Sequence, residues 1–216
     1  YGGLTRRVDG VLAPWWLDKA GVDDLVNTVF EDREQNLWAG GRDGLYRLSP
    51  ARFVTLTMED GLIGNNVISV LEDRAGAMWF GIWGGGVTRM KDKQFTSITP
   101  TNGLTSDKVL SLLEGQADTL WVGMDSVVGT GGGAGVLNRL APARSNDFPR
   151  LPELLNAPIR VMYEDAASAL WVGTGKGLNV VRRNQVVAYT MTNGLAGNNV
   201  TSLCRDRAGN IWIGTD

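Results

Sequence analysis

The stretch EDRAGAMWFGIWGGGVTR, at residues 72–89, carries the pattern that decides the fold. It contains Asp-x-x-Gly, then a tryptophan followed two residues later by glycine, then Gly-Val-Thr-Arg. Asp and Gly at this spacing favour a tight turn, and the β-branched and aromatic residues around it favour strands. The stretch therefore predicts two short strands joined by a turn, with a third strand after a glycine-rich loop.

The same pattern recurs five times in the 216 residues of the chain. Its tryptophans are spaced by 41, 42, 50 and 41 residues and are Trp38, Trp79, Trp121, Trp171 and Trp212. Six residues before them stand Asp32, Asp73, Gly115, Asp165 and Asp206. Four strands fit into each repeat, and about 40–45 residues with four strands and a tryptophan is typical of a propeller blade. The sequence thus predicts an all-β fold, a β-propeller of four-stranded blades with five repeats, as one domain over residues 1–216.

The two ends of the chain carry complementary parts of one repeat. YGGLTR at the start matches the third strand of a repeat, and IWIGTD at the end matches the second. We therefore expect a composite blade from residues 1–17 and 195–216, closed by pairing of residues 1–6 with 211–216, which would remove a free sheet edge. A chain that contains a whole number of repeats could also be an open arc of a larger ring. Without an initiator methionine, the chain is interpreted as a segment of a longer polypeptide.

Composition excludes several classes of function. The 21 Lys and Arg against 23 Asp and Glu give a net charge of -2, so no nucleic-acid partner is expected. No apolar run approaches the roughly 20 residues that span a bilayer. The absence of histidine excludes a Ser-His-Asp triad and the usual sets of zinc ligands, and the single cysteine excludes an internal disulfide. No cofactor, metal or catalytic residue is predicted.

Residues that recur in every blade are interpreted as structural, because a catalytic site needs unique residues. The aspartates are expected to accept backbone amide hydrogens in their turns, and the tryptophans to fill the space between blades. A ring of inner-strand glutamates could hold a cation, but solvated strand ends explain the ring equally well. Its members are Glu31, Glu72, Glu114 and Glu164.

One observation points to binding. The distance from the third strand to the next aspartate position is always 26 residues, whereas the second-to-third connection varies from 9 to 18. Because that connection opens on one face with the fourth-to-first connection, all the length variation falls on a single face, where binding loops are expected. An aromatic platform beside amides and charges suits a small polar ligand or glycan. The candidates are Trp83, Arg42, Asp43, Lys176, Tyr1, Asp125, Asn66 and Asn199; plain surface is the alternative interpretation.

The repeats resemble the two-component regulator propeller family, most closely in EDRAGAMWFGIWGGGVTR (72–89) and RDRAGNIWIGTD (205–216). The resemblance implies a non-enzymatic sensor propeller in the periplasmic or extracellular part of a bacterial signalling receptor. It also implies that the membrane span and the intracellular output domain belong to the parent polypeptide. The sequence carries no legible signal for an oligomeric state.

Two other functions stay open at this stage. The first is a lectin-like or protein-interaction propeller without a signalling role. The second is a propeller lyase or hydrolase, although the lack of histidine weighs against many such reactions. The sequences on either side of this segment in the parent protein would separate signalling from simple binding.

Overall fold

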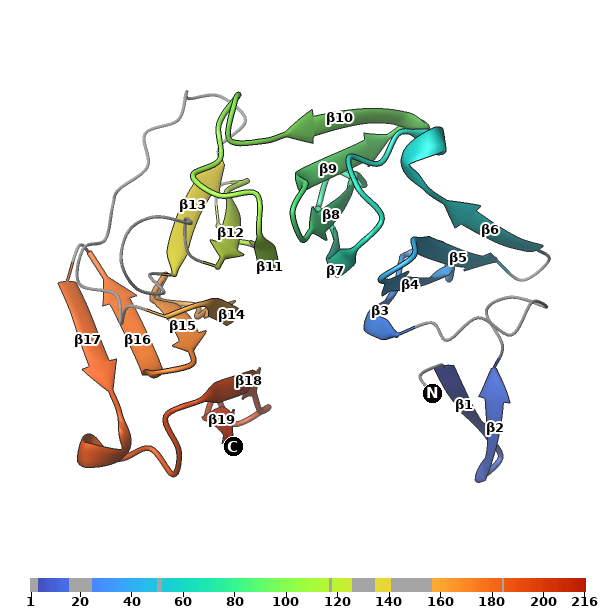
Figure 1. Ribbon diagram of the computed structural model, residues 1–216. Coiled ribbons are helices and arrows are strands. Elements are labelled where there is room, and N and C mark those ends of the chain that lie inside the picture. The colour runs from blue at the N-terminus through green and yellow to red at the C-terminus, as the bar shows by residue number, and fades with distance from the viewer. Residues whose placement is uncertain are drawn as a thin grey trace. The chain divides into compact units, whose positions relative to one another are not determined.

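A computed structural model describes residues 4–15, 25–49, 52–116, 118–125, 135–140, 157–183 and 185–216. The chain divides into two compact units, residues 1–97 and residues 98–216, each of which is described by itself. In the described ranges the only helical elements are two single 3-10 turns, Met58–Asp60 and Met191–Asn193. All other regular structure is antiparallel β-strand (Figure 1).

The first unit contains a hairpin and two four-stranded sheets, which we call blades one and two. The hairpin pairs β1 (Leu4–Val8) with β2 (Val11–Trp15). Blade one is β3 (Val26–Glu31), β4 (Leu37–Gly41), β5 (Leu45–Ser49) and β6 (Arg52–Leu56). Blade two is β7 (Val67–Glu72), β8 (Met78–Ile82), β9 (Gly86–Lys91) and β10 (Gln94–Ile98).

The second unit contains blades three and four and a two-stranded sheet that we call half-blade five. Blade three is β11 (Val109–Glu114), β12 (Leu120–Met124) and β13 (Val136–Leu140). Blade four is β14 (Ile159–Glu164), β15 (Leu170–Thr174), β16 (Gly177–Arg182) and β17 (Gln185–Tyr189). Half-blade five pairs β18 (Val200–Arg205) with β19 (Ile211–Thr215). The stretch in which blade three would have its fourth strand lies outside the described residues.

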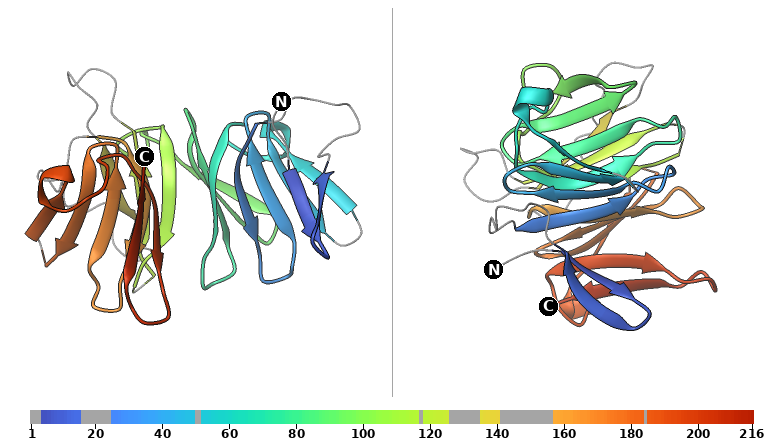
Figure 2. Two further views of the ribbon diagram at one scale, coloured as in Figure 1. Left: turned by 90° about the horizontal axis from the view of Figure 1, so that it is seen from below. Right: turned by 90° about the vertical axis from the view of Figure 1, so that its right-hand side faces the viewer.

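These sheets confirm the predicted all-β fold of four-stranded blades. In each complete blade the strands follow one another in chain order across the sheet, from the inner first strand to the outer fourth strand. The strands therefore run alternately up and down, as the two views of Figure 2 show. Each blade has an end with the first-to-second turn, which we call the Asp-turn end, and an opposite end with the second-to-third connection, the loop end.

The glycine that follows each blade tryptophan by two residues lets neighbouring blades come close. A Cβ on Gly40 would lie 2.8 Å from Val67 of blade two, and a Cβ on Gly173 would lie 2.7 Å from Val200 of half-blade five. Both distances are shorter than a carbon–carbon contact allows, so any side chain here would push the inner strands apart. This packing accounts for the glycine at these two seams.

Blade tryptophans pack differently in the two units. Trp38 is 1% exposed and lies with its ring centroid 5.7 Å from that of Phe80 in blade two. Trp171 packs with Ile213 in the apolar cluster between blade four and half-blade five. Trp212 is 65% exposed, which differs from the expected packing, because no described sheet of the second unit follows β19.

The hairpin β1–β2 behaves as the outer half of a blade. Leu4 packs with Ala39 and Tyr46, so the hairpin lies against blade one. Its strands match the expected third and fourth strands in position, and half-blade five supplies a first and a second strand. The pairing of residues 1–6 with residues 211–216 stays a prediction.

Candidate ligand-binding face

The repeated aspartates close the turns at the Asp-turn end. In blade two, Asp73 accepts hydrogen bonds from the Ala77 amide (2.8 Å) and from the indole Nε1 of Trp79 (2.8 Å). The amide donor lies four residues after the aspartate, and the indole donor six. The same indole bond is made to Asp32 by Trp38 (2.7 Å), to Asp165 by Trp171 (3.1 Å) and to Asp206 by Trp212 (2.9 Å). These carboxylates are thus occupied by structural bonds.

Hydrogen bonding keeps the carboxyl groups of Asp32 and Asp206 ionised, because it lowers the pKa of each. The side-chain amide of Asn210 and the indole of Trp212 lower the pKa of Asp206 to about 2. Burial raises the pKa of Asp32, but the bonds from Trp38 and Asn36 outweigh burial and leave that pKa below its ordinary value. Groups of this kind do not suit proton transfer near neutral pH, since a general acid or base works best with a pKa near the operating pH.

Blade three replaces the aspartate with Gly115, and a neighbouring glutamate takes the space. A Cβ on Gly115 would collide with Oε2 of Glu164, which belongs to blade four. That oxygen accepts a hydrogen bond from the Gln116 amide at 3.0 Å. The Nε1 of Trp121 is buried without a hydrogen-bond partner among the described residues. Blade three therefore lacks the carboxylate bonds within its own turn and keeps a bond to the next blade.

The predicted acidic ring has a structural use at two of its positions. Glu72 accepts a hydrogen bond from the Arg33 amide at 3.1 Å, just as Glu164 does from Gln116. Arg33 also donates to the carbonyl oxygens of Asp73 and Arg74, at 3.2 and 3.3 Å. No cluster of three or more candidate metal ligands occurs among the described residues.

The predicted binding residues that the structure describes lie at the loop end, where backbone bonds join Trp83 to Asn66 and tie Asn199 and Asp125 to a neighbouring connection. The Trp83 amide donates to the Asn66 carbonyl (2.9 Å), and the Asp216 amide donates to the Asn199 carbonyl (3.3 Å). The Asp125 amide donates in the same way to the Lys108 carbonyl (2.9 Å). Each bond joins a second-to-third loop to the residue that precedes an inner strand. The two kinds of connection therefore meet at one end within each unit.

In the first unit the loop end presents an aromatic ring beside amides. Trp83 is 36% exposed, at the start of a run of three glycines. Asn66 is held by the Nδ2 of Asn27, which donates to the Asn66 Oδ1 at 3.4 Å and to the Val67 carbonyl at 3.1 Å. Arg42 and Asp43 are exposed on the corresponding loop of blade one.

Asn27 was not among the predicted residues. It is the residue that the register of β3 skips, a β-bulge between Val26 and Thr28. A bulge re-aims one side chain out of the regular alternation. All five inner strands skip a residue at this position, and the others are Ile68, Leu110, Arg160 and Thr201. A bulge is not visible in the residue pattern, but the unique amide at this place in the repeat was a signal.

In the second unit the loop end is charged. Asn199 donates from Nδ2 to the Asp216 carboxylate at 2.6 Å. Lys176 is exposed in the turn after β15, and its amide donates to the Thr174 hydroxyl at 3.2 Å. Asp125 is partly buried at the end of β12. Of the predicted binding residues, Tyr1 lies outside the described residues.

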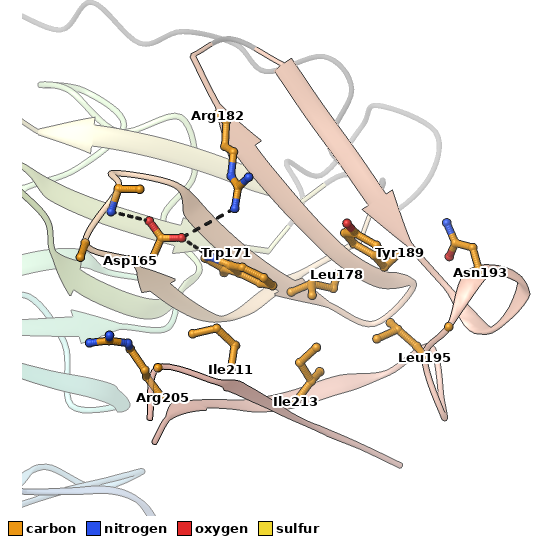
Figure 3. A pocket seen from close by; sticks show the side chains of 14 residues that line it. Asp165, Trp171, Leu178, Arg182, Tyr189, Asn193, Leu195, Arg205, Ile211 and Ile213 are labelled. Carbon is orange, nitrogen blue, oxygen red and sulfur yellow. Dashed lines mark hydrogen bonds and ion pairs between the residues drawn. The ribbon is translucent and has the colours of Figure 1, made fainter. Parts of the chain in front are cut away.

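A separate cavity of about 730 Å³ lies in the second unit between blade four and half-blade five (Figure 3). Trp171, Leu178, Ile211 and Ile213 form its apolar wall, and Arg205 lies at one end. Arg182 projects over it and lies 4.0 Å from the Asp165 carboxylate. The repeat pattern gave no signal for this cavity, because its wall consists of residues that also form the blade core.

Sheets of this kind, with one tryptophan and one closed turn per repeat, define a β-propeller. The two component regulator propeller family model matches residues 61–84 and 194–216, so the chain carries repeats of that family and the resemblance seen in the sequence is confirmed. No curated protein matches the chain. No helix in the described part of the chain is long and apolar enough to cross a membrane.

Solved structures share the fold at low sequence identity. The extracellular domain of a protein assigned as a hybrid two component system of B. thetaiotaomicron is 22% identical, with a TM-score of 0.73 over 88% of this chain and 26% of that one. The extracellular domain of an assigned one component system of the same organism is 18% identical, with a TM-score of 0.70 over 98% and 31%. PorZ of Porphyromonas gingivalis, a surface component of the type-IX secretion system, is 18% identical, with a TM-score of 0.67 over 99% and 35%.

These neighbours are much longer than the present sequence. The chain spans about a quarter to a third of each of the three. Propellers named as enzymes are also similar, including a gluconolactonase of Xanthomonas campestris at 16% identity with a TM-score of 0.62. At such identities the likeness shows the fold alone.

Proposed function

We propose that the chain is a non-enzymatic, ligand-binding sensor propeller, a segment of the extracytoplasmic sensing region of a bacterial signal-transduction receptor. The family repeats and the extracellular two component system domains among the neighbours support this proposal. The carboxylates at the Asp-turn end already accept hydrogen bonds from their own turns and tryptophans, which supports a role without catalysis. A lectin-like or protein-interaction propeller without signalling is the alternative.

The observation that carries the proposal is the convergence of loops at the loop end. The connections that vary in length are bonded to the residues before the inner strands, so a rigid scaffold holds variable loops. Trp83 lies there next to Asn66, within reach of the amide of Asn27. An indole face with neighbouring amides suits the apolar face and hydroxyl groups of a sugar ring.

Substitution of Trp83 tests the ligand site. A glycan array would identify the oligosaccharide with the strongest response, and calorimetry would then compare its binding to the variants. We expect Trp83→Ala to weaken binding about five- to tenfold, equivalent to about 1 kcal/mol of lost stacking. Trp83→Phe should retain part of the affinity, and the melting temperature of both variants should stay near that of the wild type.

The matched control is Met58→Ala, which removes an apolar side chain that is 59% exposed in the same unit but contributes no aromatic ring. Its binding should equal that of the wild type. Equal binding by the wild type and Trp83→Ala would place the ligand elsewhere. A parent sequence without a membrane span or an output domain would favour the alternative function.

A further inference from the structure

Two amide side chains meet at the loop end of the seam between blades one and two. Nδ2 of Asn27 donates to the Val67 carbonyl at 3.1 Å and to Oδ1 of Asn66 at 3.4 Å. Because the Val67 carbonyl can only accept, the group of Asn27 that faces it must be the NH2 group. The atom of Asn66 that shares this donor must then be its oxygen. These bonds therefore fix the orientation of both amides.

This orientation leaves one acceptor and one donor for a ligand. Oδ1 of Asn27 and Nδ2 of Asn66 have no hydrogen-bond partner in the described part of the chain. The seam between blade four and half-blade five differs at the same positions. Arg160 replaces the first asparagine there, and Nδ2 of Asn199 is already bonded to the Asp216 carboxylate at 2.6 Å. Of these two seams, the first alone presents an open pair of amides.

Apolar side chains lie beside this amide pair. The Trp83 amide donates to the Asn66 carbonyl, and the Trp83 side chain is 36% exposed. Ile63 is 37% exposed and lies against the glycine run after Trp83, since a Cβ on Gly85 would lie 3.0 Å from its Cγ2. A Cβ on Gly84 would meet no described atom within 4 Å, so the surface next to Trp83 is open.

Ile63 and Trp83 both depart from the repeat. The residue after the Gly-Leu turn is Thr105 or Ala196 in the corresponding connections, whereas it is isoleucine here. A single exposed apolar side chain needs no explanation. Two of them, side by side with an amide donor and an amide acceptor, match a ligand group that contains both a methyl group and an amide.

We propose that this part of the loop end binds a sugar that carries an N-acetyl group. The proposal rests on the proposed function and names the class of sugar. The acetamido carbonyl accepts from Nδ2 of Asn66, and the acetamido N–H donates to Oδ1 of Asn27. The methyl group packs on Ile63, and the sugar ring stacks on Trp83. A hydroxyl group in place of the acetamido group brings no methyl group to Ile63 and leaves one of the amides without its partner, so a plain hexose binds more weakly.

The test compares N,N′-diacetylchitobiose with cellobiose by calorimetry on the whole chain. The two disaccharides share their linkage and differ only in the acetamido groups that replace one hydroxyl group on each ring. We expect the wild type to bind diacetylchitobiose at least about tenfold more tightly than cellobiose. Asn66→Asp keeps the oxygen that faces Asn27 but removes the donor, so it should abolish most of this preference.

Ile63→Ala should reduce the preference about fourfold, because it removes the contact with the methyl group. Met58→Ala, in the same connection, is the matched control and should keep the preference of the wild type. Trp83→Ala should weaken binding of both sugars, which tests the proposed function separately. The melting temperatures of all four variants should stay near that of the wild type, since these side chains lie at the surface.

Equal affinity of the wild type for the two sugars would overturn this inference and leave the proposed sugar-binding face in place. A preference that survives both Asn66→Asp and Ile63→Ala would overturn it as well, because the acetamido group would then lie elsewhere. Binding of neither sugar at about 10 mM would also overturn it, and the glycan array would then decide on the proposed function by itself.

Discussion

Asp206 shows how one carboxylate can hold a whole turn together. It accepts the Asn210 amide and side-chain nitrogen, both at 2.8 Å, and the indole of Trp212 at 2.9 Å. The three donors come from the turn and from the second strand, so the bonds fix the first-to-second connection before any packing between blades is considered. Hydrogen bonds to an ionised group are among the stronger ones in proteins.

These bonds predict a dependence of stability on pH. Because the pKa of Asp206 falls from 3.8 to about 2 on folding, its carboxylate stabilises the fold above pH 3.8 and loses this effect as pH falls from 3.8 towards 2. Asp32 and Asp165, whose pKa values are also lowered, act in the same direction. Urea unfolding of the wild type and Asp206→Asn should therefore show a stability difference that shrinks between pH 4 and pH 2. A constant difference over that range would contradict this account.

The role of the aspartates as turn residues could be predicted from their recurrence, but the details could not. The recurrence predicted that each aspartate accepts backbone amide hydrogens in its turn. The structure adds a second donor, the indole of the tryptophan six residues further along the chain. The bonds that Glu72 and Glu164 accept from the preceding blade could not be predicted, because contacts between repeats cannot be derived from spacing within one repeat. Gly115 was recognised as a departure, but its physical cause, Glu164 of the next blade, needed the fold.

At the scale of the strand, glycine position decides how closely two blades pack. Gly173 of β15 lies against both Val161 of its own blade and Val200 of half-blade five, and a Cβ there would approach them to 2.6 and 2.7 Å. Gly175 lies two residues further on, where a Cβ would meet only Asn199 Oδ1 at 3.7 Å, an ordinary contact.

The two glycines provide a matched pair of variants. Gly173→Ala should destabilise the fold by about 1–3 kcal/mol, because the added methyl group overpacks the seam. Gly175→Ala should change the free energy of unfolding by less than about 0.5 kcal/mol. Denaturant unfolding of both variants measures the difference. Equal effects would show that strand properties, not blade packing, explain the conserved spacing of tryptophan and glycine within the repeats.

The turns before the inner strands were predicted only in part. Glycine followed by leucine at residues 61–62 and 194–195 is typical of a turn, and the structure shows a reciprocal cap in front of each pair. The Thr57 hydroxyl accepts the Glu59 amide hydrogen, while the Asp60 carboxylate accepts the Thr57 amide hydrogen, and Thr190 with Asn193 repeats the arrangement. The signal was present as TMEDGL and TMTNGL, which follow the Thr-x-x-Asp/Asn pattern of a capping box. It was missed because the capped helix is a single 3-10 turn.

At the scale of the molecule, the regular spacing of the repeats predicted blades and strands, because every repeat forms the same turns and strands from the same pattern of residues. It also predicted that the two ends of the chain pair, and this stays a prediction because the pairing depends on the arrangement of all blades together. Our prediction is that β1 lies antiparallel beside β19 in one composite blade. Two half-blades with open edges would otherwise expose unpaired amide and carbonyl groups.

Deletion of residues 1–13 tests this closure. The shortened chain should leave β19 with a free edge and should aggregate at concentrations where the full chain stays monodisperse in light scattering. As a control, Leu12→Ser retains the strand backbone and should stay dispersed. Unchanged dispersion and unchanged exchange of the β19 amides after the deletion would mean that β1 does not cover this edge.

The central claim is that the loop end is the ligand-binding face. Hydrogen–deuterium exchange with and without the strongest binder from the glycan array tests it most directly. We expect protection of residues 41–44, 65–66 and 82–86, with no change in the turns from Asp32 to Asn36 and from Asp73 to Ala77. Protection of those Asp turns, with the Trp83 loop unaffected, would contradict it.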